Sequence, residues 1–325
     1  MDEQRVDGTG ATGASAPSEP SGAPGPTGYV GRYAPSPTGH LHLGNLRTAV
    51  VAWARARSVG GRFLVRVEDI DETRCRPEFE AQQLEDLRAV GVEWDGAPVR
   101  QSERYALYDA ALLRLPVFPC FCSRKDIQRE LQSVMGAPHG PPGAYPGTCR
   151  DLDEGERRER AARLAEEGRG PSLRLRSDVT KWRARDFFAG EVTGAVDDMV
   201  LRRADGMWAY NLAVVVDDGE QGVTEIVRGR DLLDSAPRQV HLAHALGYPE
   251  LAYAHVPLVV NREGRRLAKR DGDVTLREVT AGHAQRWILD SLGFPGLASV
   301  AELPDVFDLP TSAPTPCGNT RAVWR

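Results

Sequence analysis

The stretch Gly31-Arg32-Tyr33-Ala34-Pro35-Ser36-Pro37-Thr38-Gly39-His40-Leu41-His42-Leu43-Gly44-Asn45 decides how this chain folds. The apolar start at Tyr29 and Val30 predicts a short buried strand, and the prolines and glycines after it predict a compact turn. A helical pattern begins at Leu46, so Asn45 is expected to cap the helix. A strand, a glycine-bearing turn and a helix present backbone N–H groups and the positive end of a helix dipole to a phosphate. A tight strand–helix connection with a surface histidine would have the same pattern.

Composition limits the class of protein. The chain has 325 residues, of which 41% are hydrophobic and 27% charged, as in a soluble globular protein with one large or two modest domains. The net charge of −5 implies that any contact with nucleic acid uses a local basic face. Five cysteines are an odd number, which argues against a disulfide framework and for a reducing cytoplasm. No apolar run is long enough to span a membrane, and the N-terminus lacks the pattern of a signal peptide.

A candidate ligand-binding carboxylate follows the first helix. Residues 46–59 have helical periodicity and residues 63–67 form a strand, which together predict a right-handed βαβ crossover. Glu68 follows that strand directly, at the edge where a doubly wound sheet binds ligands. It is therefore a candidate for binding an ammonium group, and a solvated acidic loop is the alternative. Further helices are expected over 77–89 and 103–115.

The middle of the chain predicts a hairpin and an arginine clamp. Residues 199–203 and 208–216 flank Ala204-Asp205-Gly206, which is typical of a hairpin with a type I′ turn. A strand beginning at Val223 ends near Arg228, whose guanidinium fork suits a ligand carboxylate, although a surface salt bridge is the alternative. A helix over about 235–246, a strand over 254–260 and a basic loop over 261–272 follow.

Three cysteines have the spacing of a metal site. Cys120 and Cys122 are one residue apart, and Cys149 follows in the segment Tyr145-Pro146-Gly147-Thr148-Cys149. Three thiolates complete most of a tetrahedral zinc shell. Buried thiols without a metal explain the same three residues, so the spacing leaves both readings open.

Two segments resemble the signatures of class I aminoacyl-tRNA synthetases. Residues 35–39 and 42–45 are similar to the HIGH signature, with Asn45 in place of its last histidine, and the lead-in from Arg32 is of the glutamyl type. Arg266–Arg270 resembles the KMSKS loop, in which Lys269 matches the lysine that the family uses on the phosphates of ATP. The resemblance implies an α/β fold: a Rossmann-like class I catalytic core with an inserted zinc-bearing connective subdomain.

The zinc element is similar to that of glutamyl-queuosine tRNA(Asp) synthetases. In that family a tyrosine oxygen is the fourth ligand, which implies a zinc ion held by Cys120, Cys122, Tyr145 and Cys149. His139 lies in a Gly/Pro-rich insertion between the ligand pairs and is a rival for the fourth position. Such a zinc ion would be structural.

The same resemblance implies the other site residues. His42 and Lys269 are expected to be catalytic, and ATP is expected to bind at His42, Gly44, Asn45 and Lys269. The residues expected to bind glutamate are Arg32, Tyr33, Ala34, Pro35, Ser36, Glu68, Tyr210 and Arg228.

The implied activity is a ligase reaction in two steps. ATP, with Mg²⁺, activates L-glutamate to glutamyl-AMP, and the glutamyl group passes to the queuosine base of tRNA(Asp). We expect a cytoplasmic monomer with three parts: a disordered leader (1–27), a catalytic domain (28–290, with the insertion at about 116–190) and a Pro-rich tail (291–325) without an anticodon-binding domain. The alternatives are a truncated glutamyl-tRNA synthetase that charges a tRNA 3′ end, a small-molecule acyl-adenylate ligase, and a non-catalytic paralogue that only binds tRNA or glutamate.

Overall fold

The central sheet begins with three parallel strands. The computed structural model describes residues 27–133, 145–260, 274–308 and 322–323. In it β1 (Val30–Tyr33), β2 (Arg62–Val67) and β3 (Val99–Arg100) are adjacent and parallel, with α1 (Leu43–Ser58) between the first two and α2 (Pro77–Ala89) before the third. Because the strands are parallel, the residues that follow them meet at one edge of the sheet.

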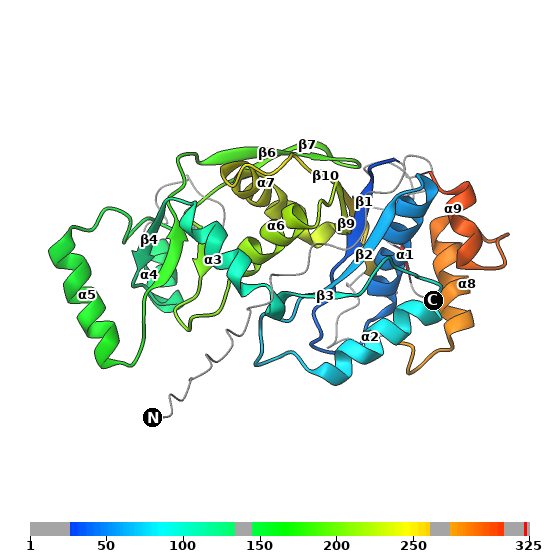
Figure 1. Cartoon of the computed structure of the whole chain (residues 1–325), viewed down its shortest axis with the longest axis horizontal. Coiled ribbons are helices and arrows are strands. Elements are labelled where there is room, and N and C mark those ends of the chain that lie inside the picture. Colours follow the sequence, from blue (N-terminus) through cyan, green and yellow to red (C-terminus); the bar gives the residue numbers. More distant parts are fainter. Residues whose placement is uncertain (1–26, 134–144, 261–273, 309–321, 324–325) are drawn as a thin grey trace, which may run out of the picture.

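A second set of strands continues this sheet beside β1. Its order is β7-β6-β10-β9, and β10 runs parallel to both β6 and β9. The Thr224 backbone N–H, next to β9, donates to the carbonyl of Val30 at 2.9 Å, so β9 lies alongside β1 (Figure 1). The bounds are β6 (Lys181–Asp186), β7 (Gly190–Ala195), β9 (Glu225–Gly229) and β10 (Ala252–Val256). The chain order reverses between β1 and β9, which is the switch point where Rossmann-like folds bind ligands.

Helices cover both faces of the sheet. On one face α1 packs against Phe63, Val65 and Val227, in a core that also includes α8 (Ala281–Leu292). On the other face α7 (Ala236–Ala245) packs against Leu64 and Ile226. The alternation of side chains along each strand explains this division, and the two covered faces confirm the Rossmann-like α/β core.

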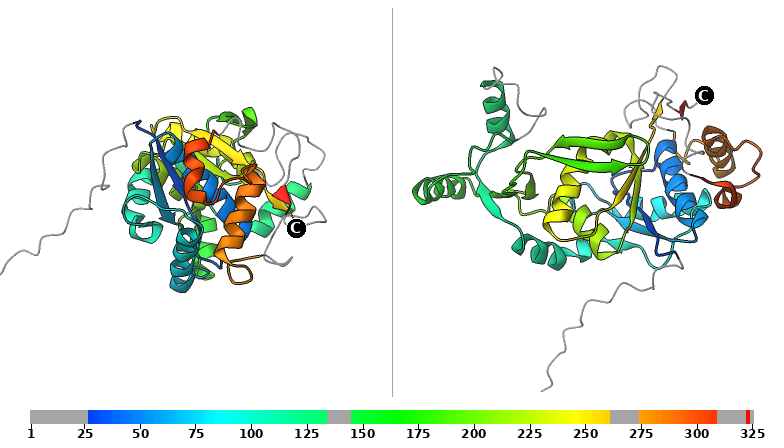
Figure 2. Two further views of the ribbon diagram at one scale, coloured as in Figure 1. Left: turned by 90° about the vertical axis from the view of Figure 1, so that its right-hand side faces the viewer. Right: turned by 90° about the horizontal axis from the view of Figure 1, so that it is seen from above.

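An inserted module forms one end of the molecule. A three-stranded antiparallel sheet, in the order β4-β5-β8, joins two helices that project away from the core (Figures 1 and 2). The bounds are β4 (Val117–Cys120), α4 (Arg124–Ser133), α5 (Glu154–Glu166), β5 (Ser172–Leu175) and β8 (Val200–Arg202). The helix α3 (Tyr105–Leu113) leads into this module from the core.

The C-terminal segment packs onto the catalytic core. Val300, Leu303 and Phe307 are buried in the same cluster as α1, in η3 (Val300–Glu302), α9 (Leu303–Val306) and the residue after it. Two short strands, β11 (Val259–Val260) and β12 (Ala322–Val323), pair in parallel. Residues of the predicted tail therefore contribute to the core. None of the helices in the described ranges is long and apolar enough to cross a bilayer.

Three predictions of local structure are wrong. The second strand of the predicted hairpin is instead the helix α6 (Tyr210–Glu220), and only an isolated bridge between Arg202 and Trp208 remains of the pairing. The helix α1 begins at Leu43 and its N-cap is His42, so Asn45 lies inside its first turn. The predicted strand over 254–260 is split at Pro257 into β10 and β11, since proline cannot donate to a ladder.

Candidate active site

One cavity gathers the predicted ligand-binding residues. It has a volume of about 310 Å³ and lies where β1, β2 and β9 end. Among its lining residues are all the described positions predicted to bind glutamate or ATP: Arg32, Tyr33, Ala34, Pro35, Ser36, His42, Gly44, Asn45, Glu68, Tyr210 and Arg228. Lys269 lies outside the described residues, so its predicted role stays a prediction.

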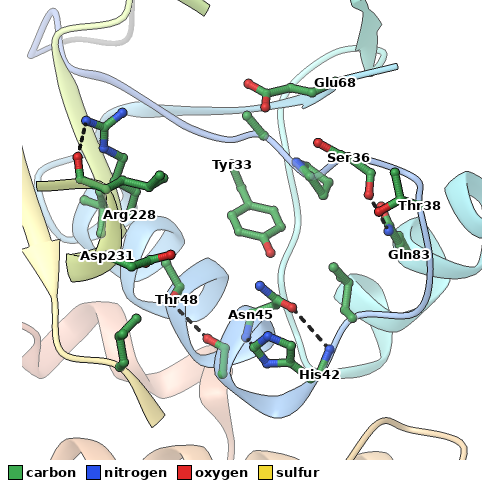
Figure 3. Close-up of a pocket in the computed structure, with 18 of the residues that line it drawn as sticks. Tyr33, Ser36, Thr38, His42, Asn45, Thr48, Glu68, Gln83, Arg228 and Asp231 are labelled. Carbon is green, nitrogen blue, oxygen red and sulfur yellow. Dashed lines mark hydrogen bonds between the residues drawn. The ribbon is translucent and has the colours of Figure 1, made fainter. Parts of the chain in front are cut away.

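The cavity has two chemically different ends. Figure 3 shows Glu68 and Arg228 on one side of the Tyr33 ring and His42 with Asn45 on the other. The first end offers a carboxylate and a guanidinium, which complement an amino acid. The second end offers the start of a helix and an imidazole, which complement a phosphate.

His42 and Asn45 cap the helix α1 reciprocally. The Asn45 backbone N–H donates to Nδ1 of His42 at 3.2 Å, and the His42 backbone N–H donates to Oδ1 of Asn45 at 3.3 Å. Because Nδ1 accepts a hydrogen bond, the neutral imidazole carries its proton on Nε2. A Cβ atom on Gly44 would lie 2.9 Å from Cε1 of His42, so glycine leaves room for the ring.

A buried cluster of balanced charges lies behind the first end of the cavity. Nε and Nη2 of Arg32 donate to the two carboxylate oxygens of Asp218 at 3.0 and 3.1 Å. Arg66, which is 0% exposed, donates to Asp218 at 2.8 Å and to Glu68 at 3.4 Å. The charged cluster consists of three arginines and three acids: Arg32, Arg66, Arg104, Glu68, Asp217 and Asp218. The equal numbers of positive and negative groups make such deep burial tolerable.

The cluster shifts the pKa values of its acids in opposite directions. Burial raises the pKa of Glu68, and the charges of Arg66 and Arg32 only partly oppose this effect. Burial would also raise the pKa of Asp218, but Arg32 and Arg66 outweigh it and hold that pKa below its ordinary value. Asp218 therefore stays ionised as the partner of both arginines, and Glu68 is the acid that protonates more easily.

Arg228 is held by neutral groups. Its Nε donates to Nε2 of His255 at 2.9 Å, and its Nη1 donates to Oε1 of Gln239 at 2.6 Å. Its Nη2 donates to the Leu232 carbonyl and the Ser235 hydroxyl, both in η2 (Arg230–Ser235). Since a guanidinium only donates, His255 accepts at Nε2 and donates from Nδ1 to Asp186 at 2.7 Å. Burial and the charge of Arg228 lower the pKa of His255, which keeps it neutral. These four hydrogen-bond acceptors carry no charge, and Arg228 also lines the cavity.

The three cysteines meet in the inserted module. The sulfur atoms of Cys120, Cys122 and Cys149 lie within 4.8 Å of one another. The hydroxyl oxygen of Tyr145 is 3.4 Å from Sγ of Cys120 and accepts a hydrogen bond from the Cys149 backbone N–H at 2.7 Å. Three sulfurs and one phenol oxygen around one point fit a tetrahedral zinc ion. His139, the rival ligand, lies outside the described residues.

Several residues of the site were missed from the sequence. Asp217 and Asp218 seemed to mark the end of a strand, and His255 lay unremarked in an apolar strand. A charged or titratable residue inside a buried run was the available signal, because such groups are buried only with partners.

Comparison with known proteins gives a consistent picture. The profile of the class I tRNA synthetases (E and Q), catalytic domain, matches residues 29–291. The chain is 55% identical over 277 residues to a glutamyl-Q tRNA(Asp) synthetase of Nocardia farcinica, covering 82% of this chain and 86% of that protein. It is 47% identical over 293 residues to a protein of the same name from Cutibacterium acnes, covering 88% of this chain and 82% of that protein.

A solved structure has the same fold. The glutamate-tRNA synthetase from Elizabethkingia anophelis superposes with a TM-score of 0.75 at 26% identity. The match covers 91% of this chain and 68% of that one.

Proposed function

Since this chain belongs to the class I tRNA synthetases for glutamate and glutamine, we propose that it joins L-glutamate to the queuosine base of tRNA(Asp) with ATP as the energy source. The observation that carries the proposal is the single cavity that joins an amino-acid end at Glu68 and Arg228 to a phosphate end at His42. The names of the two relatives described above supply the acceptor. The chain is accordingly a ligase.

Glutamate fits the first end of the cavity by charge. Glu68 receives the α-ammonium group of the substrate. Arg228 keeps one hydrogen on Nη1 beyond its bond to Gln239, and Arg32 keeps Nη1, because its bonds to Asp218 use Nε and Nη2. These donors bind the carboxylates, with Tyr33 and Tyr210 beside them.

ATP occupies the second end. The first turn of α1, His42 and the residues at Gly44 and Asn45 stabilise the phosphates, and Lys269 contributes a further charge. A carboxylate oxygen of glutamate attacks the α-phosphorus, and the bond to the β-phosphate breaks and releases pyrophosphate. No side chain need act as a nucleophile, so the residues act by positioning and charge. Mg²⁺ bound with ATP neutralises phosphate charge.

The second step transfers the acyl group. A hydroxyl oxygen of the acceptor attacks the carbonyl carbon of glutamyl-AMP, and the bond from that carbon to the phosphate oxygen breaks. AMP leaves with the electron pair, and its phosphate takes up the hydroxyl proton. The product is an ester.

The inserted module binds one structural zinc ion under this proposal. Cys120, Cys122, Cys149 and Tyr145 would be its ligands, and zinc would hold the residues after β4 next to those before α5. We expect a cytoplasmic monomer, because its proposed substrates ATP and tRNA are found in the cytoplasm.

Labelled glutamate tests the function. Purified protein with ATP and Mg²⁺ is offered tRNA(Asp) with queuosine, tRNA(Asp) without it, and tRNA(Glu). We expect label only on the queuosine-bearing tRNA. Label on tRNA(Glu) would show a minimal charging enzyme instead. Glutamate-dependent pyrophosphate exchange without labelled RNA would indicate another acceptor, and no exchange would indicate a binding protein.

A further inference from the structure

A second cavity adjoins the first. It has a volume of about 250 Å³, and four residues line both cavities: Ser36, Thr38, Glu68 and Tyr210. The shared rim lies at the glutamate end, away from His42. A molecule in the second cavity would therefore approach the activated glutamyl group and not the phosphate end.

The wall of the second cavity combines aromatic rings and positive charge. Trp208 and Tyr210 line it, and Arg74 and Arg203 contribute guanidinium groups. Tyr210 is exposed, and an exposed ring can stack on a nucleobase, while arginines bind the phosphates beside an unstacked base. The carboxylates of Glu68 and Asp71 also line the cavity and can accept hydrogen bonds.

Gln101 is one of the residues that line this cavity, and its side-chain carbonyl oxygen is buried. It follows β3 directly, at the same edge of the sheet as Glu68, and is 0% exposed. Its Nε2 donates to Oδ2 of Asp217 at 2.8 Å. A carboxylate only accepts, so the amide nitrogen must face Asp217 and the oxygen must face away. Within the described part of the chain, Oε1 has no hydrogen-bond partner.

The orientation of Gln101 is fixed by its neighbours. Asp217 also accepts hydrogen bonds from Nε of Arg104 at 2.6 Å and from the Tyr108 hydroxyl at 2.8 Å. The carboxylate therefore cannot turn without breaking these bonds. A buried hydrogen-bond acceptor that is held in place without a partner is suited to accept a hydrogen bond from a ligand.

We propose that the second cavity binds the acceptor base and that Gln101 is a specificity-determining residue for it. Oε1 of Gln101 accepts a hydrogen bond from an O–H or N–H group of the base, which holds the reacting hydroxyl toward the rim at Ser36 and Glu68. A base that lacks this donor would leave Oε1 buried and unpaired, which selects against it. This inference rests on the proposed function and adds how the acceptor is chosen.

Two variants that each lose one hydrogen bond to the same oxygen of Asp217 separate this role from a structural one. Gln101→Met and Tyr108→Phe each remove one donor to Oδ2 of Asp217, but only Gln101 is among the residues lining the second cavity. Pyrophosphate exchange measures adenylate formation, and transfer to queuosine-bearing tRNA(Asp) measures the second step. We expect Q101M to lower kcat/KM for transfer about 10- to 100-fold. We expect exchange in Q101M to stay within about threefold of Y108F, and transfer by Y108F to stay near that of the wild type.

Equal losses of transfer in Q101M and Y108F would overturn the proposal, as would unchanged transfer in Q101M. Should Q101M fail to fold, Arg203→Met and Arg163→Met decide, since each removes one arginine paired with a nearby acid and only Arg203 lines the cavity. We expect R203M alone to raise the KM for tRNA about threefold or more, and equal KM values would contradict the inference. A wild-type chain that forms the adenylate but transfers nothing to tRNA(Asp) would refute the proposed function itself, and the assigned occupant with it.

Discussion

The catalytic core and the inserted module are stabilised in different ways. The core buries a large apolar cluster around α1 and a network of paired charges around Arg66. The module has a small apolar cluster of its own, and two of the buried side chains in that cluster are thiols. Its buried residues are Phe118, Cys120, Tyr145, Cys149 and Leu152. The module also projects from the rest of the molecule (Figure 2).

This difference shows which interactions stabilise the folded state of each region. Apolar burial and balanced charges order the core from within. A cluster as small as that of the module supplies little hydrophobic stabilisation, so we infer that the proposed zinc ion would supply most of the module's stability. The two regions should therefore respond to different perturbations, and each prediction below tests that separation.

Removal of zinc should have the largest effect. Structural zinc binding contributes about 10–16 kcal/mol in zinc-finger peptides, which is more than the stability of many domains. We expect Cys149→Ser to lower the zinc content from one ion per chain to none and to make the region around α4 and α5 sensitive to protease. Elemental analysis and limited proteolysis measure both effects.

Cys75→Ser is the matched control, because Cys75 lies outside the metal cluster. It should retain zinc and protease resistance. A C149S protein with full zinc content would contradict the metal assignment, and unchanged protease resistance without zinc would show that the module is ordered by its own core.

Loss of Arg66 should lower the stability of the core and leave the module unchanged. Arg66→Met leaves Asp218 and Glu68 buried without one of their cations, and removing one member of a buried pair costs about 3–5 kcal/mol. The change should appear as a lower free energy of unfolding by denaturant, with zinc content unchanged.

Arg163→Met provides the comparison on the surface. Its pair with Glu159 is exposed, and such pairs contribute about 0–1 kcal/mol. If the two variants were equally stable, the buried charges would not support the core as described.

Removal of the Tyr145 hydroxyl should have a smaller effect inside the module. Tyr145→Phe keeps the ring and loses the oxygen beside Cys120. We expect zinc affinity, measured by competition with a chelator, to fall about 10- to 100-fold. His139→Ala should leave the affinity unchanged, and the reverse result would assign the fourth ligand to His139.

Acid should weaken glutamate binding in the core. Burial raises the pKa of Glu68 above its ordinary value of 4.5, so this carboxylate is lost at a higher pH than an exposed one. As pH falls through the raised pKa, the charge that binds the ammonium group disappears and the KM for glutamate should rise. Glu68→Gln should have a higher KM that no longer shows this rise, and a parallel rise in both proteins would argue against Glu68 as the binding group.

The sequence predicted elements with clear borders better than buried ones. The helix α2 matches the predicted bounds, because Pro77 starts it and Gly91 follows it. The helix α6 was predicted as a strand, because Val214, Val215 and Val216 are β-branched and the helix is buried on all sides over this stretch. A fully buried run has no polar face, so its periodicity is hidden.

Site residues could be predicted where they lie at the carboxyl end of a strand that is recognisable in the sequence. Glu68 directly follows β2, Arg228 is the penultimate residue of β9, and both line the cavity. Gln101 follows a strand of only two residues, which no periodicity could reveal. The pairing of Arg32 with Asp218 joins residues 186 positions apart, and only the packing of α6 on the sheet brings them together.

The position of the label within the RNA tests the central claim most directly. Queuosine-bearing tRNA(Asp) that has received labelled glutamate is cut by a ribonuclease, and the anticodon fragment is separated from the 3′-terminal fragment. Our account predicts all label in the anticodon fragment, released by mild alkali as expected of an ester. Label on the 3′-terminal fragment would contradict it and would make the protein a charging enzyme.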